Sequence, residues 1–143
     1  MKILVSACLL GVNCRYNAKR IPVSAKMERL SQKHELVPFC PESYSGLATP
    51  REPSEIRNGR VYARDGRDVT ENFARGAVEA LALSQFLGCD CAVLKEKSPS
   101  CGSGKVYDGS FSGKLVDGDG FAAAALKRAG IPVYGESRLD ELL

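Results

Sequence analysis

Three short apolar runs, each followed by a loop of small residues that carries a cysteine, constrain this chain more than any other feature. The runs are Ile3–Val5, Leu36–Phe39 and Cys91–Leu94, and the cysteines that follow them are Cys8, Cys40 and Cys101. Unbroken apolar runs of this length are typical of strands in a parallel sheet that is covered on both faces. Ligands bind at the carboxyl edge of such sheets. The pattern therefore predicts that the three thiols meet at one edge of the sheet.

Three helices are predicted around these strands, each beginning at a capping side chain. They are expected from Ser24 to near His34, from Thr70 to Gly88, and from Asp119 to Gly130. The first of them joins two parallel strands, which makes a βαβ unit with a right-handed crossover. A fourth strand, Ile131–Tyr134, is expected at the edge of the sheet because Pro132 has no N–H to donate.

The remaining segments are rich in turn residues. Residues Ser43–Pro53 are too irregular for a helix or strand and long enough to be functional. Arg60–Arg64 lies between two Gly-containing turns and predicts an edge excursion or hairpin, and Val106–Phe111 predicts a small hairpin over the site. Together these elements indicate an α/β fold: a single three-layer domain, residues 1–143, with a mostly parallel, Rossmann-like sheet.

Composition bounds the function. A net charge of +3 with scattered basic residues argues against nucleic-acid binding, and no run approaches the roughly 20 apolar residues of a membrane span. Only five residues separate Lys2 from Cys8, whereas a secretory leader needs an apolar stretch of about 7–15. We therefore expect a cytoplasmic protein. In a reducing compartment, clustered cysteines are more often ligands or catalytic groups than structural disulfides.

The six cysteines divide by position. No Cys-x-x-Cys pair is present, and Cys89 and Cys91 are expected to serve packing alone. Cys14 lies six residues beyond Cys8 and could turn toward the same site as a spare thiol. Three convergent thiolates could hold zinc with an open fourth position, or an iron–sulfur cubane with one iron free. The spacing of the residues leaves both alternatives open.

Acid–base chemistry would have to come from groups other than imidazole, because the only histidine, His34, is expected at the surface end of a helix. Glu42 lies two residues beyond Cys40, and Ser100 precedes Cys101, so both can reach whatever the thiols hold. Arg51 and Lys97 could supply positive charge to a substrate or to an anionic cluster.

The motifs that carry these residues resemble those of a bacterial family, the thiouracil desulfurases, which were long catalogued as a domain of unknown function. The matching segments are Ser6–Gly11 with Arg15-Tyr16, Cys40–Glu42 with Gly46–Arg51, Lys97–Gly102, Asp68–Thr70, Tyr107–Phe111 and Gly118–Gly120. Ala48 stands where a proline is common, and Cys14 occupies a position that is variable in the family. The resemblance spans nearly the whole chain.

The resemblance implies a [4Fe-4S] cluster held by Cys8, Cys40 and Cys101, with the fourth iron open and no protein ligand on it. It also implies a glutamate and a serine beside the cluster, which correspond to Glu42 and Ser100. The implied reaction is a non-redox desulfuration, in which the open iron acts as a Lewis acid on a thiocarbonyl sulfur and water replaces that sulfur on carbon. The implied partner is a small thiolated base or nucleoside.

Two readings from other classes stand beside this one. The first is a small enzyme that depends on zinc or on a thiol, which analysis for iron and sulfide against zinc would separate. The second is a non-catalytic protein that carries a cluster or binds a nucleotide, which would release no sulfide from thiouracil.

Overall fold

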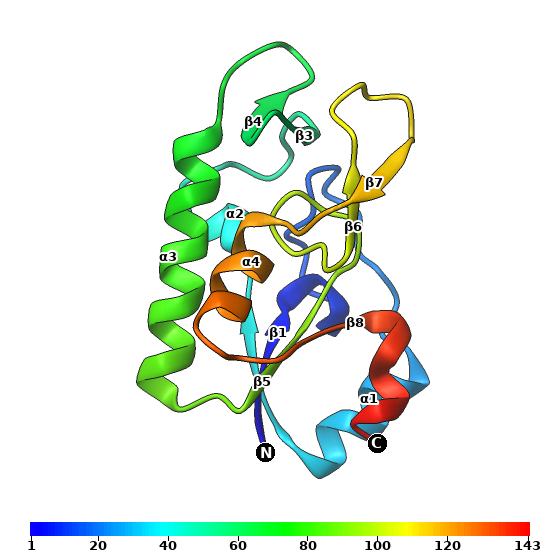
Figure 1. The fold of residues 1–143 in the computed structure, drawn as a ribbon. Coiled ribbons are helices and arrows are strands. Elements are labelled where there is room, and N and C mark those ends of the chain that lie inside the picture. The colour runs from blue at the N-terminus through cyan, green and yellow to red at the C-terminus, as the bar shows by residue number, and fades with distance from the viewer.

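The computed structural model describes residues 1–143 and has a four-stranded parallel sheet at its centre (Figure 1). Its strands are β1 (Lys2–Ser6), β2 (Glu35–Phe39), β5 (Cys91–Leu94) and β8 (Val133–Gly135). Their spatial order is β2-β1-β5-β8, and every pairing is parallel. The predicted α/β class is confirmed, and β8 lies at the edge as the position of Pro132 predicts.

Helices cover both faces of this sheet. The helical elements are η1 (Ala7–Leu10), α1 (Ala25–Lys33), α2 (Pro41–Tyr44), α3 (Thr70–Leu87), α4 (Phe121–Arg128) and η2 (Glu136–Glu141). In Figure 1, α3 and α4 lie on one side of the sheet, while α1 and η2 lie on the other. Alternate sheet residues therefore enter two cores, as the period of a strand requires.

The two cores show why these runs became strands. Leu4, Ala92 and Leu94 pack with the alanine-rich side of α3 and α4, whereas Ile3 and Val93 pack with residues of α1 on the opposite face. No residue from Cys91 to Leu94 is more than 3% exposed. A strand buried this completely cannot shift register without exposing apolar surface, so the loop that follows it starts from a fixed point. The run Leu36–Phe39 was expected to be buried in the same way, but β2 is an edge strand and only its last residue, Phe39, is buried.

Two antiparallel hairpins lie beyond the carboxyl edge of the sheet, at the end of the molecule opposite both termini (Figure 1). The first joins β3 (Ser54–Arg57) to β4 (Arg60–Ala63), and the second joins β6 (Lys105–Tyr107) to β7 (Leu115–Asp117). We call these two hairpins, with the loop between β6 and β7, the cap. Most cap side chains are at least partly exposed, in contrast to the sheet.

Two predicted helix caps are wrong, although the helices themselves are present. Helix α3 begins after Val69, and Thr70 is its first residue, with its hydroxyl accepting from the Val61 N–H and donating to Asp68. Helix α4 begins after Gly120. The side chains of Thr70 and Asp119 are of a type that caps helices, but each is hydrogen-bonded to another part of the chain instead.

Asp119, the side chain expected to begin α4, instead accepts from the backbone N–H of Gly104 and from Lys127. The predicted ends are correct, because Gly88 and Gly130 both have the left-handed backbone that stops a helix. Ser24 accepts from the Met27 N–H and caps α1 as predicted.

Two predicted segment boundaries also need correction. Residues from Ser43 were expected to be irregular, yet Ser43 and Tyr44 belong to the one-turn helix α2, which Pro41 opens at its first position. The small hairpin predicted within Val106–Phe111 is longer, because Lys105–Tyr107 pairs with Leu115–Asp117.

The order of the strands alone indicates where a ligand would bind. From β1 the chain first moves outward to β2 by way of α1, and later continues on the other side of β1 through β5 to β8. The strand order therefore reverses between β1 and β5. In doubly wound sheets, the loops that leave this point in opposite directions open a crevice at the carboxyl ends of the strands.

Candidate functional site

A cavity of about 450 Å³ occupies this crevice, between the carboxyl edge of the sheet and the cap. We call it the cysteine pocket, because four of the six cysteines line it: Cys8, Cys14, Cys40 and Cys101. All six thiols are free. The structure thus brings together the three cysteines singled out in the sequence, and adds the spare one. Cys89 and Cys91 lie elsewhere, in or against the apolar cores, as expected.

The loop after β1 supplies two thiols. Cys8 lies in the short helix η1, which ends at Gly11 with the left-handed φ of +83° that glycine tolerates best. The chain then turns back, so that Cys14 is buried at 7% exposure, close to Cys8. The Cys40 thiol donates to the carbonyl oxygen of Cys14 at 3.9 Å, which ties the loops after β1 and β2 together.

Cys40 immediately follows β2 and begins α2. The position of α2 is set by a close approach to α3: a Cβ added at Gly76 would lie 2.3 Å from the carbonyl oxygen of Pro41. Because Glu42 is in the first turn of α2, the contact that holds this helix also fixes the start of the Glu42 side chain. No larger residue than glycine fits at position 76 without moving α2.

Cys101 lies in the loop after β5, which is braced by the start of α4. The Phe121 and Ala122 N–H groups donate to the carbonyls of Pro99 and Ser100 at 2.9 and 2.8 Å. A Cβ at Gly120 would lie 2.5 Å from the Ser100 carbonyl carbon. The loop carbonyls thus satisfy the free N–H groups at the start of the helix, and the helix in turn holds the loop.

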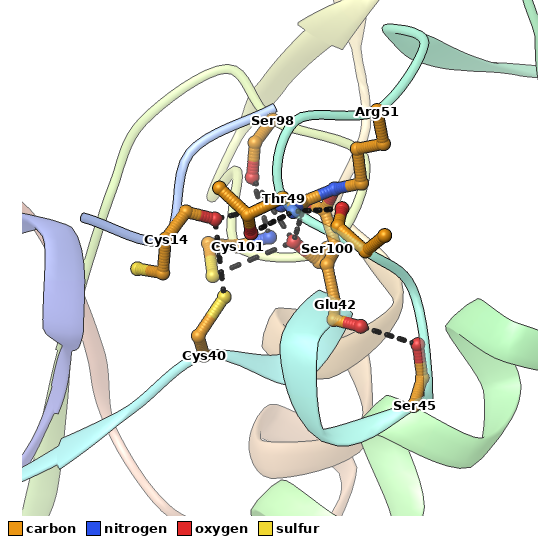
Figure 2. A network of polar contacts seen from close by, with 10 residues as sticks. Cys14, Cys40, Glu42, Ser45, Thr49, Arg51, Ser98, Ser100 and Cys101 are labelled. Atoms are coloured by element: carbon orange, nitrogen blue, oxygen red, sulfur yellow. Dashed lines mark hydrogen bonds and ion pairs between the residues drawn. The ribbon is translucent and has the colours of Figure 1, made fainter. Parts of the chain in front are cut away.

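A polar network joins three of these loops (Figure 2). The Ser100 hydroxyl donates to one Glu42 oxygen at 2.7 Å and lies 3.6 Å from the Cys101 sulfur. Arg51 Nε donates to the other Glu42 oxygen at 3.1 Å, and Arg51 Nη2 donates to the Cys14 carbonyl at 2.9 Å. The Arg51 and Glu42 side chains are only 8% and 15% exposed, so this ion pair is shielded from solvent.

Burial and contacts among the cysteines raise the pKa of Cys14, Cys40 and Cys101. Burial raises the pKa of Cys101 to about 12, against partial opposition from hydrogen bonds with Ser6 and Ser100. The pKa of Cys40 is raised, first by its hydrogen bond with Cys14 and then by burial. For Cys14 the hydrogen bond with Cys40 lowers the pKa, but contact with Cys8 and burial outweigh it.

The two cations singled out in the sequence lie at the pocket in different situations. Arg51 also donates to the Ala48 carbonyl and the Thr49 hydroxyl, so every nitrogen of its guanidinium is bound to protein oxygens. Lys97 is exposed, lines the pocket and has no ion-pair partner. Its backbone has a left-handed φ of +75°, which is uncommon for a residue with a side chain.

Sequence reasoning missed several residues that line the pocket. They are aromatic and charged side chains, mostly from the cap and the turn after Cys14: Arg15, Tyr16, Glu55, Arg64, Lys95, Glu96, Tyr107 and Phe111. Glu55 could have been found only by knowing that β3 meets the loop around Gly109. Tyr16 and Phe111 lie within motifs that were noted, and their aromatic character in such a motif was an available signal.

The donors suit a cluster better than a single ion. No three His, Cys, Asp or Glu side chains stand close enough together to hold one metal ion. Zinc would draw its sulfurs to about 2.3 Å from one centre, whereas the ligand sulfurs of a cubane lie roughly 6–7 Å apart. Soft thiolates around a cavity of this size, with basic residues nearby, fit an anionic iron–sulfur cluster.

Comparison with known proteins agrees with this chemistry. The family model for 2-thiouracil desulfurase matches residues 3–138. The chain belongs to this family. It is 42% identical to the uncharacterized protein YbbK of Bacillus subtilis strain 168, over 99% of both chains. The family prediction made from the sequence motifs is confirmed, and with it the predicted class of enzyme.

A solved structure of a desulfurase is also closely similar. The [4Fe-4S]-dependent thiouracil desulfidase TudS superposes with a TM-score of 0.93 at 46% identity, covering 99% of this chain and 94% of that one. The fold described above, a parallel sheet with helices on both faces, is therefore the fold of the [4Fe-4S]-dependent desulfidase TudS. None of the helices here is both long and apolar enough to cross a lipid bilayer.

Proposed function

We propose that residues 1–143 form one cytoplasmic desulfurase domain, which converts a thiolated pyrimidine base or nucleoside and water into the oxygen analogue and hydrogen sulfide. The observation that carries the proposal is the contact between Glu42 and Ser100 in a pocket lined by cysteines. Family membership and the desulfidase activity of TudS support it.

We assign Cys8, Cys40 and Cys101 as ligands of a [4Fe-4S] cluster, with one iron left without a protein ligand. Cys8 and Cys101 follow the buried strands β1 and β5, and Cys40 follows the edge strand β2, whose last residue Phe39 is buried; these anchors support a rigid ligand set. When bound, the cluster supplies a Lewis acid with affinity for the thiocarbonyl sulfur. Cys14 is the one other thiol within reach, and in this assignment it stays a neighbour of Cys8 and Cys40.

Glu42 is assigned as the group that moves protons. The reaction exchanges sulfur for oxygen on one carbon, so no electrons are required, but both water protons must leave the oxygen and reach the departing sulfide. A carboxylate can accept a proton from the attacking water and return it to the leaving group. The Ser100 hydroxyl is hydrogen-bonded to Glu42. It can therefore relay a proton between Glu42 and the attacking water, or hold that water in place.

Arg51 and Lys97 are assigned different roles near the substrate. Lys97 is a free cation at the rim and can meet a polar or anionic part of the substrate. Arg51 is a positioning residue, because its bonds to Glu42 and to the Cys14 carbonyl leave it no nitrogen without a protein partner. It holds the carboxylate at a fixed orientation relative to two of the cysteine loops.

The test is anaerobic reconstitution with iron and sulfide, followed by measurement of sulfide release from 2-thiouracil, 4-thiouracil and their nucleosides. Glu42→Gln and Ser100→Ala should keep the iron and lose about 10²- to 10⁴-fold in turnover, the usual contribution of general acid–base catalysis. Glu79→Gln, at an exposed position on α3, is the matched control and should behave as the wild type.

Each alternative gives a different result. Retention of zinc without iron after reconstitution would favour the zinc enzyme. A full cluster with no sulfide release from any thiolated pyrimidine would favour a cluster carrier without catalysis. Turnover of Glu42→Gln at the wild-type rate would remove Glu42 from the catalytic role.

A further inference from the structure

The loop between β6 and β7 places an aromatic ring over the cysteine pocket. Tyr107, Phe111 and Gly113 of this segment all line the pocket. Phe111 has a left-handed φ of +57°, a conformation that is a genuine outlier for a bulky side chain. Backbone strain at such a residue persists only where the surrounding structure holds it, so the contacts that hold Phe111 need to be identified.

One buried carboxylate provides that hold. Glu55, on β3, is 9% exposed, and its Oε1 accepts from the backbone N–H groups of both Gly109 and Phe111 at 3.0 Å. These are charge-assisted hydrogen bonds, which are roughly twice as strong as neutral ones. Glu55 is more than fifty positions away in sequence, so it ties the two hairpins of the cap to each other.

The same loop is also packed tightly against β3. A Cβ added at Gly109 would lie 2.7 Å from the Arg57 Cβ and 2.8 Å from the Ile56 carbonyl oxygen, and Gly109 itself has a φ of +94°. Within the loop, Asp108 accepts from the N–H of Ser110 at 2.9 Å. The loop is thus a formed structure docked on the first hairpin.

The ring of Phe111 has a charged neighbour at the pocket wall. The guanidinium carbon of Arg64 lies 5.7 Å from the ring centroid, and both residues line the pocket. Glu55 lines it as well, and its second oxygen has no hydrogen-bond partner in the protein. An aromatic face beside a cation suits a flat heterocycle, because such a ring can stack on the aromatic face.

We propose that Glu55 is a positioning residue that holds Phe111 as the stacking surface for the planar ring of the substrate. This inference rests on the proposed function and adds to it the side of the site that recognises the ring. The cysteine loops form the reacting side of the pocket, and the cap forms the side that selects a flat molecule. Glu55 acts through Phe111, while Phe111 contacts the ring.

The test separates binding from turnover in the reconstituted enzyme. Phe111→Leu keeps an apolar side chain but removes the aromatic face, so KM for thiouracil should rise about tenfold while kcat stays within about twofold. The dissociation constant for uracil, which cannot be desulfurated, should rise by a similar factor. Phe86→Leu, at a phenylalanine that is 88% exposed on α3, is the matched control and should match the wild type.

Glu55 is tested by hydrogen exchange of the loop. In Glu55→Ala the amides of Gly109 and Phe111 should exchange at least about tenfold faster, with the sheet amides unchanged, and KM should rise as in Phe111→Leu. Glu55→Gln keeps a neutral acceptor and should fall between the alanine variant and the wild type in both measurements.

The outcomes distinguish this inference from the proposed function. If the wild type desulfurates thiouracil and Phe111→Leu is unchanged in KM and in uracil binding, the stacking role is overturned while the function stands. If uracil binds and its affinity depends on Phe111, yet no sulfide is released, the function fails and the ring-binding wall stands. Unchanged exchange of Gly109 and Phe111 in Glu55→Ala would overturn the role of Glu55.

Discussion

The two sides of the cysteine pocket are built by different forces. The cysteine side consists of loops anchored on the sheet, in which β1 and β5 are almost entirely buried and the edge strand β2 buries Phe39, and its geometry follows from apolar packing on both faces. The cap is more exposed: its first hairpin packs on Phe73 of α3 through Val61, and its second is held to the first by hydrogen bonds that the buried Glu55 carboxylate accepts. Damage to the first side should therefore affect cofactor binding and stability, and damage to the cap should affect substrate recognition.

The largest expected effect comes from the thiols. Replacing Cys8, Cys40 or Cys101 singly with alanine should abolish iron retention after reconstitution, because a cubane with three protein ligands loses its hold when one is removed. Iron and acid-labile sulfide measured against protein concentration test this. Cys89→Ala, away from the pocket, is the control and should keep its iron. Cys14→Ala should keep it too.

The outcome for Cys14 sharpens the ligand set. If Cys14→Ala loses iron while one of the three predicted variants retains it, Cys14 replaces that cysteine as a ligand. Such an exchange would leave the division between the two sides of the pocket intact.

The next effect concerns Arg51, which connects Glu42 with the Cys14 loop. Arg51→Lys keeps the charge but cannot reproduce the planar set of donors, so turnover should fall about tenfold or more with little change in KM. Steady-state kinetics on thiouracil measure both constants. A rise in KM with unchanged kcat would instead make Arg51 a substrate-binding residue. Lys97→Met should show that second pattern.

A smaller effect is expected at the contact between the Cys101 loop and α4. Gly120→Ala places a Cβ within 2.5 Å of the Ser100 backbone and should lower the free energy of unfolding by about 3 kcal/mol, as overpacking does. Urea unfolding of the cluster-free protein measures this. Gly118→Ala is the control, since its nearest contact is a side-chain methyl at 3.3 Å. Equal midpoints for the two variants would contradict the prediction.

The smallest effect is on pH dependence. Burial raises the pKa of Cys101 from its ordinary value of 9.0 to about 12, so its protonated form is favoured by folding. This contribution is complete below pH 9 and is lost as the pH rises toward 12, by at most about 1.4 kcal/mol per pH unit. Urea midpoints of the cluster-free protein between pH 8 and 10 should fall less in Cys101→Ala than in the wild type. An identical fall of the urea midpoint with pH in the two proteins would contradict the prediction.

Local sequence predicted the cysteine side well because its determinants are local. Apolar runs such as Cys91–Leu94 identify buried strands, the residues after them identify the loops, and the glycines that end α3 and α4 act within one helical turn. The family motifs added the chemistry, which spacing alone had left open between zinc and a cluster. That side of the site could therefore be placed before the structure was known.

Hairpins were predicted at Arg60–Arg64 and Val106–Phe111 and are present, but the contacts that hold the cap could not be predicted, because they join distant segments. Thr70 and Asp119 have side chains suited to capping, yet Thr70 bonds to Val61 and Asp119 bonds to Gly104 and Lys127. Nothing near Glu55 in the sequence indicates that it meets Gly109. For the same reason Arg51 could be identified as a cation near the site, but not as one already bound on every nitrogen.

Gly76 carries a consequence for the tolerance of this chain to mutation. It belongs to α3 and does not line the pocket, yet its missing side chain is what allows Pro41, and so Cys40 and Glu42, to lie where they do. A scan of substitutions along α3 should therefore find one position that is sensitive in activity beyond its effect on helix propensity. Gly76 is the only glycine inside a helix of this chain, so the usual stabilising replacement of helix glycines by alanine would here displace catalytic groups.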